Sequence, residues 1–254
     1  MNALRCFIEL SYAGSAYHGW QRQPESISVQ QVMEETLSEL IGERTIVVGC
    51  GRTDTGVHAS VFYAHFQWHG TFGSRFKDYA QLTWKLNGML PDDVAVRRIF
   101  EVGDRDHARF TAQERGYTYW IHTAKDPFLE GRSARVYQNL DIEAMNEGAK
   151  CLVQKTDFAA FCKVGSLQKT TICDVRQAEW QQVAEHRLRF DISADRFLRN
   201  MVRAVVGTLV DVGRGRMAPE DVAGVLHSKD RSRAGMSAAA CGLYLARIDY
   251  PFIA

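Results

Sequence analysis

The stretch VGCGRTDTGVHAS, residues 48–60, places a single carboxylate, Asp54, among glycines and small neutral residues, with Arg52 and His58 close by. A carboxylate held in such a setting can act as a nucleophile or as a general base. It can equally accept hydrogen bonds from its own turn, with glycines supplying positive φ angles. Because apolar strands are expected on both sides, the loop is held rigidly, and this favours a built site over an idle turn.

Two familiar motifs resemble this stretch. A phosphate-binding G-x-G-x-x-G loop would need glycine where Asp54 stands, and a carboxylate there would oppose phosphate. The tripeptide DTG at 54–56 also carries the catalytic carboxylate of aspartic proteases, which combine two such motifs or a dimer axis. Since only one DTG is present, a protease is kept only as an alternative. We expect His58 to be structural, because acid–base work needs a partner that the sequence does not place.

The elements that must hold this loop follow from hydrophobic periodicity. In the first half the pattern predicts strands at 4–12, 44–49, 60–68 and 94–102 and helices at 29–41 and 75–90. In the second half it predicts strands at 115–124, 173–182, 186–193 and 243–250 and helices at 141–152 and 195–212. Both halves read β-α-β-β-α-β, which is the ferredoxin-like order.

The repeated order predicts an α+β fold of two ferredoxin-like subdomains with antiparallel sheets. The boundary is expected in the linker 103–114, which gives an N-terminal subdomain 1–103 that carries the Asp54 loop and a C-terminal subdomain 104–254. Residues 154–172 are expected to form a long polar loop, and such loops are more often functional than idle. Because this fold serves many unrelated functions, it does not by itself identify the chemistry.

Composition excludes several classes of protein. The 254 residues are 46% hydrophobic, and 31 basic side chains nearly balance 30 acidic ones, so no global field draws the chain to nucleic acid or membrane. The six cysteines form no C-x-x-C pair and no zinc-ligand spacing. No apolar run approaches the length of a membrane span. We therefore expect a soluble cytoplasmic protein with reduced thiols, no metal and no membrane contact.

Six blocks along the chain together resemble the tRNA pseudouridine synthase A family. They occur in the family's order and cover nearly the whole chain: ELSYAGSAYHGWQRQ (9–23), GCGRTDTGVHAS (49–60), KLNGMLPDDVAV (85–96), HARFTAQERGYTYWI (107–121), DRFLRNMVRAVVGTLVDVGRG (195–215) and GLYLARIDY (242–250). The resemblance implies an isomerase that converts uridine to pseudouridine in the anticodon stem-loop of tRNA, at nucleotide positions 38–40. It also implies a homodimer without metal or organic cofactor and a central RNA-binding cleft.

Within this resemblance Asp54 falls on the family's catalytic aspartate. The carboxylate can attack C6 of the uracil, attack C1′ of the sugar, or remove the 2′ proton, and the sequence leaves these routes open. A non-catalytic RNA-binding module of the same fold is the other alternative. The family pattern MVR places Arg203 as the cationic partner of the aspartate. A helix over 195–212 would align Arg196, Arg199 and Arg203 as a basic stripe.

The remaining roles also follow from the resemblance. Tyr117 matches the tyrosine that stacks on the target uracil, Leu243 the apolar residue that closes the pocket, and Arg52 the arginine that assists base flipping. The RNA-contacting segment is expected to include His107, Ala108, Arg109 and Phe110, with Arg109 on phosphate and Phe110 packed beneath. This chain has Asp106 where many members have an aromatic residue. In the stretch 162–176, Lys169 and Arg176 replace the family's usual arginine.

Overall fold

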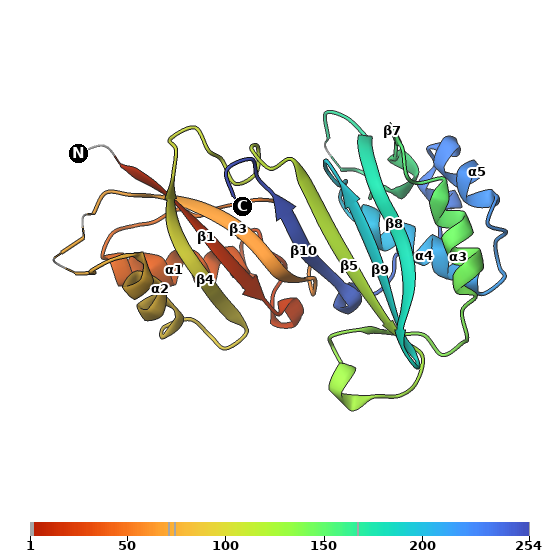
Figure 1. Ribbon diagram of the computed structural model, residues 1–254, viewed down its shortest axis with the longest axis horizontal. Coiled ribbons are helices and arrows are strands. Elements are labelled where there is room, and N and C mark those ends of the chain that lie inside the picture. The colour runs from red at the N-terminus through yellow and green to blue at the C-terminus, as the bar shows by residue number, and fades with distance from the viewer. Residues whose placement is uncertain (1–2, 71, 74, 167, 254) are drawn as a thin grey trace. The chain divides into compact units, whose positions relative to one another are not determined.

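Strand β1, Leu4–Tyr12, lies between two neighbours in the computed structural model, which describes residues 3–70, 72–73, 75–166 and 168–253 (Figure 1). Its central residues from Cys6 to Leu10 are all buried. The strands of this sheet run in the order β4-β1-β3-β10, with β2 paired to β3. Their bounds are β2 Val48–Gly49, β3 His58–Trp68, β4 Val94–Val102 and β10 Leu243–Asp249. The pairs of β1 with β3 and with β4 are antiparallel.

Helices α1, Val29–Ile41, and α2, Tyr79–Asn87, lie on one face of this sheet (Figure 1). The hydroxyl of Ser28 accepts a hydrogen bond from the backbone N–H of Gln31 and so begins α1 as an N-cap. Gly42 ends the helix with a φ of 85°, in the left-handed conformation that glycine adopts without steric cost. The two caps therefore determine where α1 begins and ends.

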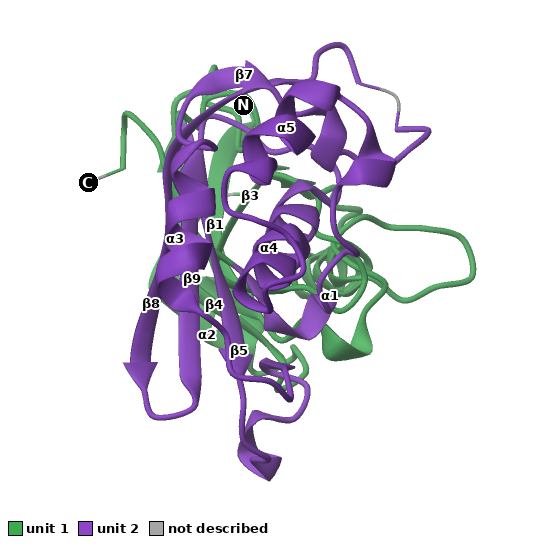
Figure 2. Ribbon diagram, turned by 90° about the vertical axis from the view of Figure 1, so that its right-hand side faces the viewer, with its two compact units in different colours: residues 1–113, 245–254 green, residues 114–244 purple. Residues whose placement is uncertain are grey.

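Strands β5, β9, β8 and β7 follow one another in this order, and the short strand β6 pairs in parallel with β5. The bounds are β5 Glu114–His122, β6 Ala134–Arg135, β7 Lys155–Asp157, β8 Ile172–Ala184 and β9 Arg187–Ala194. The helices are α3 Ile142–Lys150, α4 Met201–Gly213 and α5 Asp221–Ser228. Helices α3 and α4 cover one side of these strands (Figure 2). The chain is thus an α+β protein whose strands are mostly antiparallel.

The chain divides into two compact units, coloured in Figure 2: unit 1 is 1–113 with 245–254, and unit 2 is 114–244. This division differs from the expected one at 103 and 104. The linker stays with unit 1 because Arg5 donates a hydrogen bond to the carbonyl of Asp106 at 2.8 Å. The last residues return to unit 1 because β10 lies next to β3.

The strand at 4–12 and the helix at 29–41 agree with the sequence predictions, whereas the helix predicted over 195–212 begins only at Met201. Asn200 has a φ of 65°, which a right-handed helix cannot contain. The Asp195 carboxylate accepts hydrogen bonds from the backbone N–H groups of Arg196 and Asp174 and holds a turn instead. The predicted basic stripe is therefore wrong, because Arg196 and Arg199 precede the helix.

Three further predictions differ from the structure, two in length and one in kind. The strand predicted at 44–49 is reduced to β2, and the helix predicted at 75–90 is reduced to α2. The stretch 154–172 is not a polar loop, since it contains β7 and the 3-10 turn Ala159–Phe161. The side chains of Phe158 and Phe161 are fully buried there. Tertiary burial of these rings orders a stretch that has no periodicity of its own.

Candidate active site

The Asp54 loop is held along one side by the segment that follows β1. The hydroxyls of Tyr12 and Thr53 are hydrogen-bonded at 2.8 Å, and the backbone N–H of Trp20 donates to the carbonyl of Thr53 at 3.3 Å. The N–H of Gly56 donates to the carbonyl of Tyr17 at 3.3 Å. The residues on either side of Asp54 are therefore fixed by the same neighbouring segment.

Two glycines in that segment allow its close approach. A Cβ atom on Gly14 would lie 2.0 Å from the carbonyl oxygen of Val57, and one on Gly19 would lie 2.3 Å from that of Thr53. Both distances are far below van der Waals contact, and Gly19 also has a φ of 84°. The glycines of YAGSAYHGW are thus explained by the packing of one loop on the other.

His58 is buried, and its Nδ1 accepts a hydrogen bond from the backbone N–H of Gly14 at 3.1 Å. An accepting Nδ1 requires the neutral ring with its proton on Nε2. The contact gives His58 the structural task expected from the sequence, which is to join the two loops. It also identifies this histidine as part of the support of the site.

Asp54 itself sits in a turn and is half-buried. Its carbonyl accepts a hydrogen bond from the N–H of Val57 at 3.1 Å, and Gly56 has a φ of 75°. Arg52 is exposed, and its Nε donates to the side-chain oxygen of Gln21 at 3.0 Å. The turn therefore places the carboxylate and is compatible with either interpretation of Asp54.

The other expected catalytic residues belong to unit 2. Among the residues from Met201 to Val210, Arg203 alone is not buried, and its Nε donates to the carbonyl of Ala238 at 2.7 Å. Tyr117, on β5, is half-buried and meets the ring of Phe197 edge-on, with centroids 5.1 Å apart. Leu243 is buried at the start of β10.

The expected RNA-contacting segment divides into a buried and an exposed part. Ala108 is fully buried: its N–H donates to Nδ1 of His65 at 3.2 Å, and its carbonyl accepts from the hydroxyl of Tyr250. Phe110 is 75% exposed, and the guanidinium of Arg109 lies 5.5 Å from its ring centroid. The expectation that Phe110 packs beneath the segment is therefore wrong, because Ala108 fills that position.

The pKa values of two histidines at this segment, His65 on β3 and His107, are both lowered. Burial lowers the pKa of His65 from 6.5 to about 4, and the nearby His107 and Arg5 lower it further. Burial also lowers the pKa of His107, as does Arg5. The two rings meet edge-on with centroids 4.6 Å apart. Neutral His65 can therefore accept the hydrogen bond that holds Ala108.

The two basic residues expected from the stretch 162–176 differ in their surroundings. Lys169 is exposed. Arg176 is held by acidic neighbours, with its Nη1 2.5 Å from a carboxylate oxygen of Glu114 and its Nε 3.4 Å from one of Asp174. Of the two, Lys169 is the better candidate for a phosphate contact.

The family model of tRNA pseudouridine synthase matches residues 149–251. The tRNA pseudouridine synthase A of Bacteroides fragilis is 43% identical over 99% of this chain and 98% of its own length. This chain belongs to the tRNA pseudouridine synthase A family. The family's enzyme from Porphyromonas gingivalis is 45% identical over 97% of both chains, and that from Ruminiclostridium cellulolyticum is 35% identical over 98% of this chain and 100% of its own.

A crystal structure of a Cbf5-Nop10-Gar1 complex is a more distant match, with a TM-score of 0.36 and 9% identity over 94% of this chain and 57% of that chain. This similarity is too low to identify a fold.

Among the described residues of this tRNA pseudouridine synthase A family member, no group of three or more histidine, cysteine, aspartate or glutamate side chains could hold a metal ion. No helix in the described part of the chain is long and apolar enough to cross a membrane.

Sequence reasoning missed several residues that support the site. Tyr12, Thr53 and Trp20 hold the Asp54 loop, and Ala238 binds Arg203. The glycines at 14 and 19 were the available signal for the first contact, since closely spaced glycines often mark backbone approach. No signal in the sequence pointed to Ala238.

Proposed function

We propose that this chain isomerises uridine to pseudouridine in the anticodon stem-loop of tRNA, with Asp54 as the catalytic carboxylate. The observation that carries the proposal is the Asp54 loop, which is fixed by backbone contacts to the segment at 12–20. Membership of the family supports it, because Asp54 lies in the block GCGRTDTGVHAS, which resembles the block that carries the family's catalytic aspartate. A rigidly placed carboxylate is what covalent or general-base catalysis requires.

The reaction breaks the C1′–N1 glycosidic bond, turns the uracil and forms a C1′–C5 bond, after which the C5 proton leaves. The three routes open to a carboxylate all need Asp54 at a defined position relative to the sugar and base. We propose that Arg203 and Tyr117 take part in the same reaction, and that Leu243 contributes an apolar wall. Tyr117 can offset part of the stacking that a flipped uridine loses, on the order of 1–3 kcal/mol.

Binding of the tRNA is proposed to use Arg52 at the flipped nucleotide and the segment His107–Phe110 with Lys169 on the backbone. The exposure of Arg52, Arg109 and Phe110 supports these roles. A planar guanidinium both stacks on bases and pairs with phosphate. Ala108 contributes through its backbone, which holds the segment in place rather than touching RNA.

The decisive experiment measures tritium release from tRNA that carries tritium at C5 of its uridines. We expect release with the unaltered protein and none with Asp54→Asn, which keeps the shape of the side chain but removes the carboxylate. Affinity for tRNA should stay within about threefold, since one acid contributes little to holding a polyanion. Equal release by both proteins would contradict the proposal and leave a non-catalytic RNA-binding module. Cleavage of peptides would point to the protease alternative instead.

Three further properties are proposed on the family resemblance. The protein is a homodimer, works in the cytoplasm where tRNA is modified, and needs neither metal nor organic cofactor. Light scattering should give the mass of two chains of 28.7 kDa. Dialysis against a chelator should leave tritium release unchanged, and a loss restored by one metal ion would contradict the third property.

We also propose that each unit is a variant of the ferredoxin-like fold. Unit 1 supports this with the order β1-α1-β2-β3-α2-β4 along the chain and with β4-β1-β3 in the sheet, β2 lying next to β3. Unit 2 has the order β5-α3-β8-β9-α4, with β6 and β7 added, and lacks the last strand of the pattern because most of β10 belongs to unit 1. An experimental structure in which β1 is not between β3 and β4 would contradict this.

A further inference from the structure

The segment Ala234–Ala239, sequence AGMSAA, lies against helix α4 within unit 2. A Cβ atom on Gly207 would lie 1.7 Å from the carbonyl oxygen of Met236, and one on Gly235 would lie 2.8 Å from backbone atoms of Gly207 and Thr208. The N–H of Gly235 also donates to the hydroxyl of Thr208 at 2.8 Å. The two backbones touch directly, so the position of the segment depends on the helix without intervening side chains.

One residue of this segment holds Arg203 twice. The N–H of Ala238 donates to the backbone carbonyl of Arg203 at 2.9 Å, and the Nε of Arg203 donates to the carbonyl of Ala238 at 2.7 Å. A guanidinium is a planar fork with five N–H donors. Holding its Nε therefore restricts the orientations that the plane of the two terminal nitrogens can adopt.

A second arginine ties the segment in place. Nη1 of Arg231 donates to the carbonyl of Ala234 at 3.2 Å, and its Nη2 donates to the hydroxyl of Ser237 at 3.0 Å. The same hydroxyl accepts from the side-chain amide of Asn200 at 2.7 Å, at the start of α4. Arg231 thus bridges two points of the segment, and one of them also contacts the helix.

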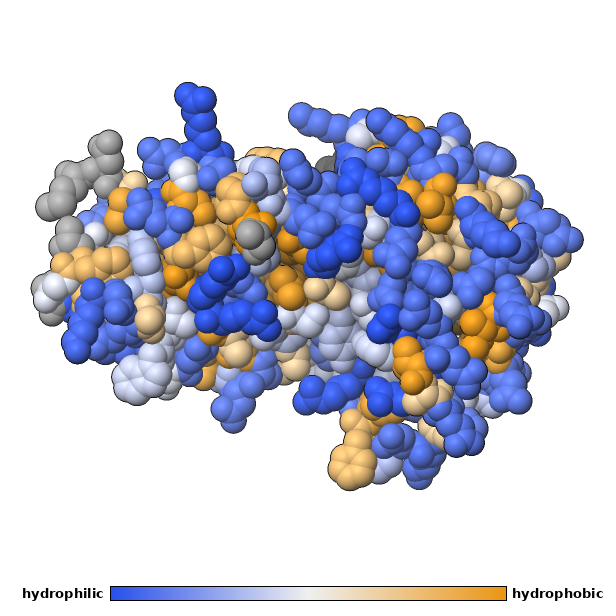
Figure 3. Space-filling model, in the orientation of Figure 1, coloured by the Kyte–Doolittle hydropathy of each residue, from blue (hydrophilic) through white to orange (hydrophobic). Residues whose placement is uncertain are grey.

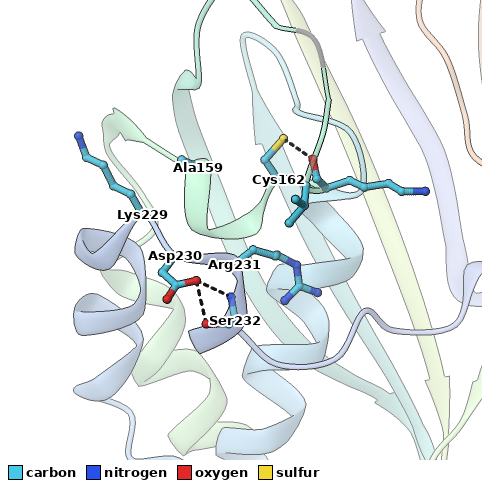
Figure 4. Close-up of a pocket in the computed structure, with 8 residues that line it drawn as sticks. Ala159, Cys162, Lys229, Asp230, Arg231 and Ser232 are labelled. Atoms are coloured by element: carbon cyan, nitrogen blue, oxygen red, sulfur yellow. Dashed lines mark hydrogen bonds between the residues drawn. The ribbon is translucent and has the colours of Figure 1, made fainter.

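Arg231 comes from a fixed turn, shown in Figure 4. The carboxylate of Asp230 accepts hydrogen bonds from the N–H and the hydroxyl of Ser232, each at 2.8 Å. The side chain of Arg231 borders an open cavity of about 480 Å³. Because the cavity is open, shortening Arg231 widens it and leaves no closed void.

We propose that Arg231 is a positioning residue for the reaction, acting on Arg203 through Ser237 and Ala238. The inference rests on the proposed catalytic role of Arg203. Without the bridge from Arg231, the segment loses two of the hydrogen bonds that hold the carbonyl of Ala238 against Nε, and the guanidinium of Arg203 is held less firmly in its orientation. Misplacement of a catalytic group lowers turnover without weakening substrate binding in proportion.

The first test compares Arg231→Ala, Arg231→Lys and the matched control Arg233→Ala. Arg233 lies on the same 3-10 turn, Arg231–Arg233, and its side chain is exposed. We expect Arg231→Ala to lower kcat between about tenfold and about a hundredfold, with KM for tRNA changed less than about threefold. Arg231→Lys should restore only part of the lost kcat, since one ammonium cannot replace the planar fork of the guanidinium. Arg233→Ala should keep kcat. Equal losses in Arg231→Ala and Arg233→Ala, or a loss confined to KM, would overturn the proposal.

The second test is a double-mutant cycle with Arg203→Met, measured under single-turnover conditions with excess enzyme. If Arg231 acts through Arg203, Arg231→Ala should add less than about twofold to the loss already caused by Arg203→Met. The same fold-loss in both backgrounds would show an independent role and overturn the proposal. Thermal unfolding of each variant checks that the fold persists. Comparing the kcat of Ser237→Ala with that of Ser237→Thr tests the same bridge at the hydroxyl that Arg231 contacts.

These outcomes separate the two claims. A wild-type protein that releases no tritium would refute the proposed function itself. Loss of turnover in Arg203→Met together with full turnover in Arg231→Ala would refute only the positioning role. Full turnover in Arg203→Met would refute the role of Arg203 and the inference with it, while leaving Asp54 as the catalytic residue.

Discussion

At the scale of single residues, the structure separates the groups proposed to react from the groups that hold them. Asp54 is placed by contacts of its neighbours Thr53 and Gly56, and Arg203 by the carbonyl of Ala238. Arg203 is also the one side chain in Met201–Val210 that is not buried. Its accessibility on a largely buried helix is compatible with the proposed role.

Replacement of Arg203 by Met tests that interpretation. We expect Arg203→Met to lower kcat by about a hundredfold, because a fixed charge that acts on the reacting groups contributes on that order. Affinity for tRNA should fall much less. Arg216→Met removes the same charge from an exposed position after α4 and should change neither quantity appreciably. Filter binding and tritium release measure the two effects, and equal losses in both would make Arg203 a phosphate contact.

At the scale of elements, close backbone packing decides which glycines can be replaced. Helix α4 touches the segment at 234–239 through Gly207, where a Cβ atom would lie 1.7 Å from a carbonyl oxygen. Gly224, on helix α5, is exposed, and a Cβ atom there would lie no closer than 3.8 Å to another group, the Arg233 guanidinium. The two helical glycines have opposite surroundings.

These surroundings predict stability changes of opposite sign. Gly207→Ala should lower the free energy of unfolding by about 3 kcal/mol or more, because backbone must move to admit the methyl group. Gly224→Ala should raise it by up to about 1 kcal/mol, because alanine favours the helix. Urea denaturation of the two variants provides the measurement. A neutral or stabilising Gly207→Ala would contradict the packing described for α4.

The contact between β3 and the segment around Ala108 predicts a dependence on pH. His65 accepts from the N–H of Ala108 only when it is neutral, and its folded pKa lies at about 4 instead of 6.5. Because the unfolded chain binds the proton more readily, this contribution to stability is complete above pH 6.5 and is lost as pH falls through about 4. The loss attributable to His65 is on the order of 3 kcal/mol.

His65→Asn tests the assignment, since the Asn carbonyl can accept the same hydrogen bond but does not titrate. Between pH 7 and pH 4.5, the free energy of unfolding should fall less steeply for the variant than for the unaltered protein. The matched replacement His186→Asn, at an exposed histidine of the β8–β9 turn, should leave the steepness unchanged. Parallel pH profiles for His65→Asn and the unaltered protein would contradict the assignment.

At the scale of the whole molecule, charge is nearly balanced, with 31 basic and 30 acidic side chains. The face drawn in Figure 3 is largely hydrophilic, with smaller apolar patches between the charged groups. Attraction to a polyanion must therefore come from a few side chains rather than from net charge. Because the family's substrate is tRNA, a polyanion, these few basic side chains are the ones expected to determine its binding.

The salt dependence of tRNA binding measures how many basic side chains contact phosphate. We expect affinity to fall as salt rises from about 50 to about 200 mM, because bound phosphates release counterions. Arg109→Ala should reduce the slope of log affinity against log salt by about one. Arg44→Ala, at another exposed position in unit 1, should keep the slope. An unchanged slope for Arg109→Ala would remove it from the phosphate contacts.

Much of this molecule follows from the sequence alone. The bounds of β1 follow from its apolar run, and those of α1 from its helical periodicity and from the Ser28 and Gly42 caps, which are local signals. The family follows from residue types in six blocks whose order along the chain resembles that of the family, and the proposal for Asp54 follows from the same blocks. These features depend on neighbours within a few residues or on the linear order of motifs, and both are visible in a sequence.

Other features exist only in three dimensions. The start of α4 at Met201, the burial of Phe158 and Phe161, and the return of the C-terminal strand to unit 1 depend on partners far along the chain. The hold of Ala238 on Arg203 spans 35 residues. Periodicity reports which face of an element is apolar, whereas packing and hydrogen bonding determine which distant backbone meets that face.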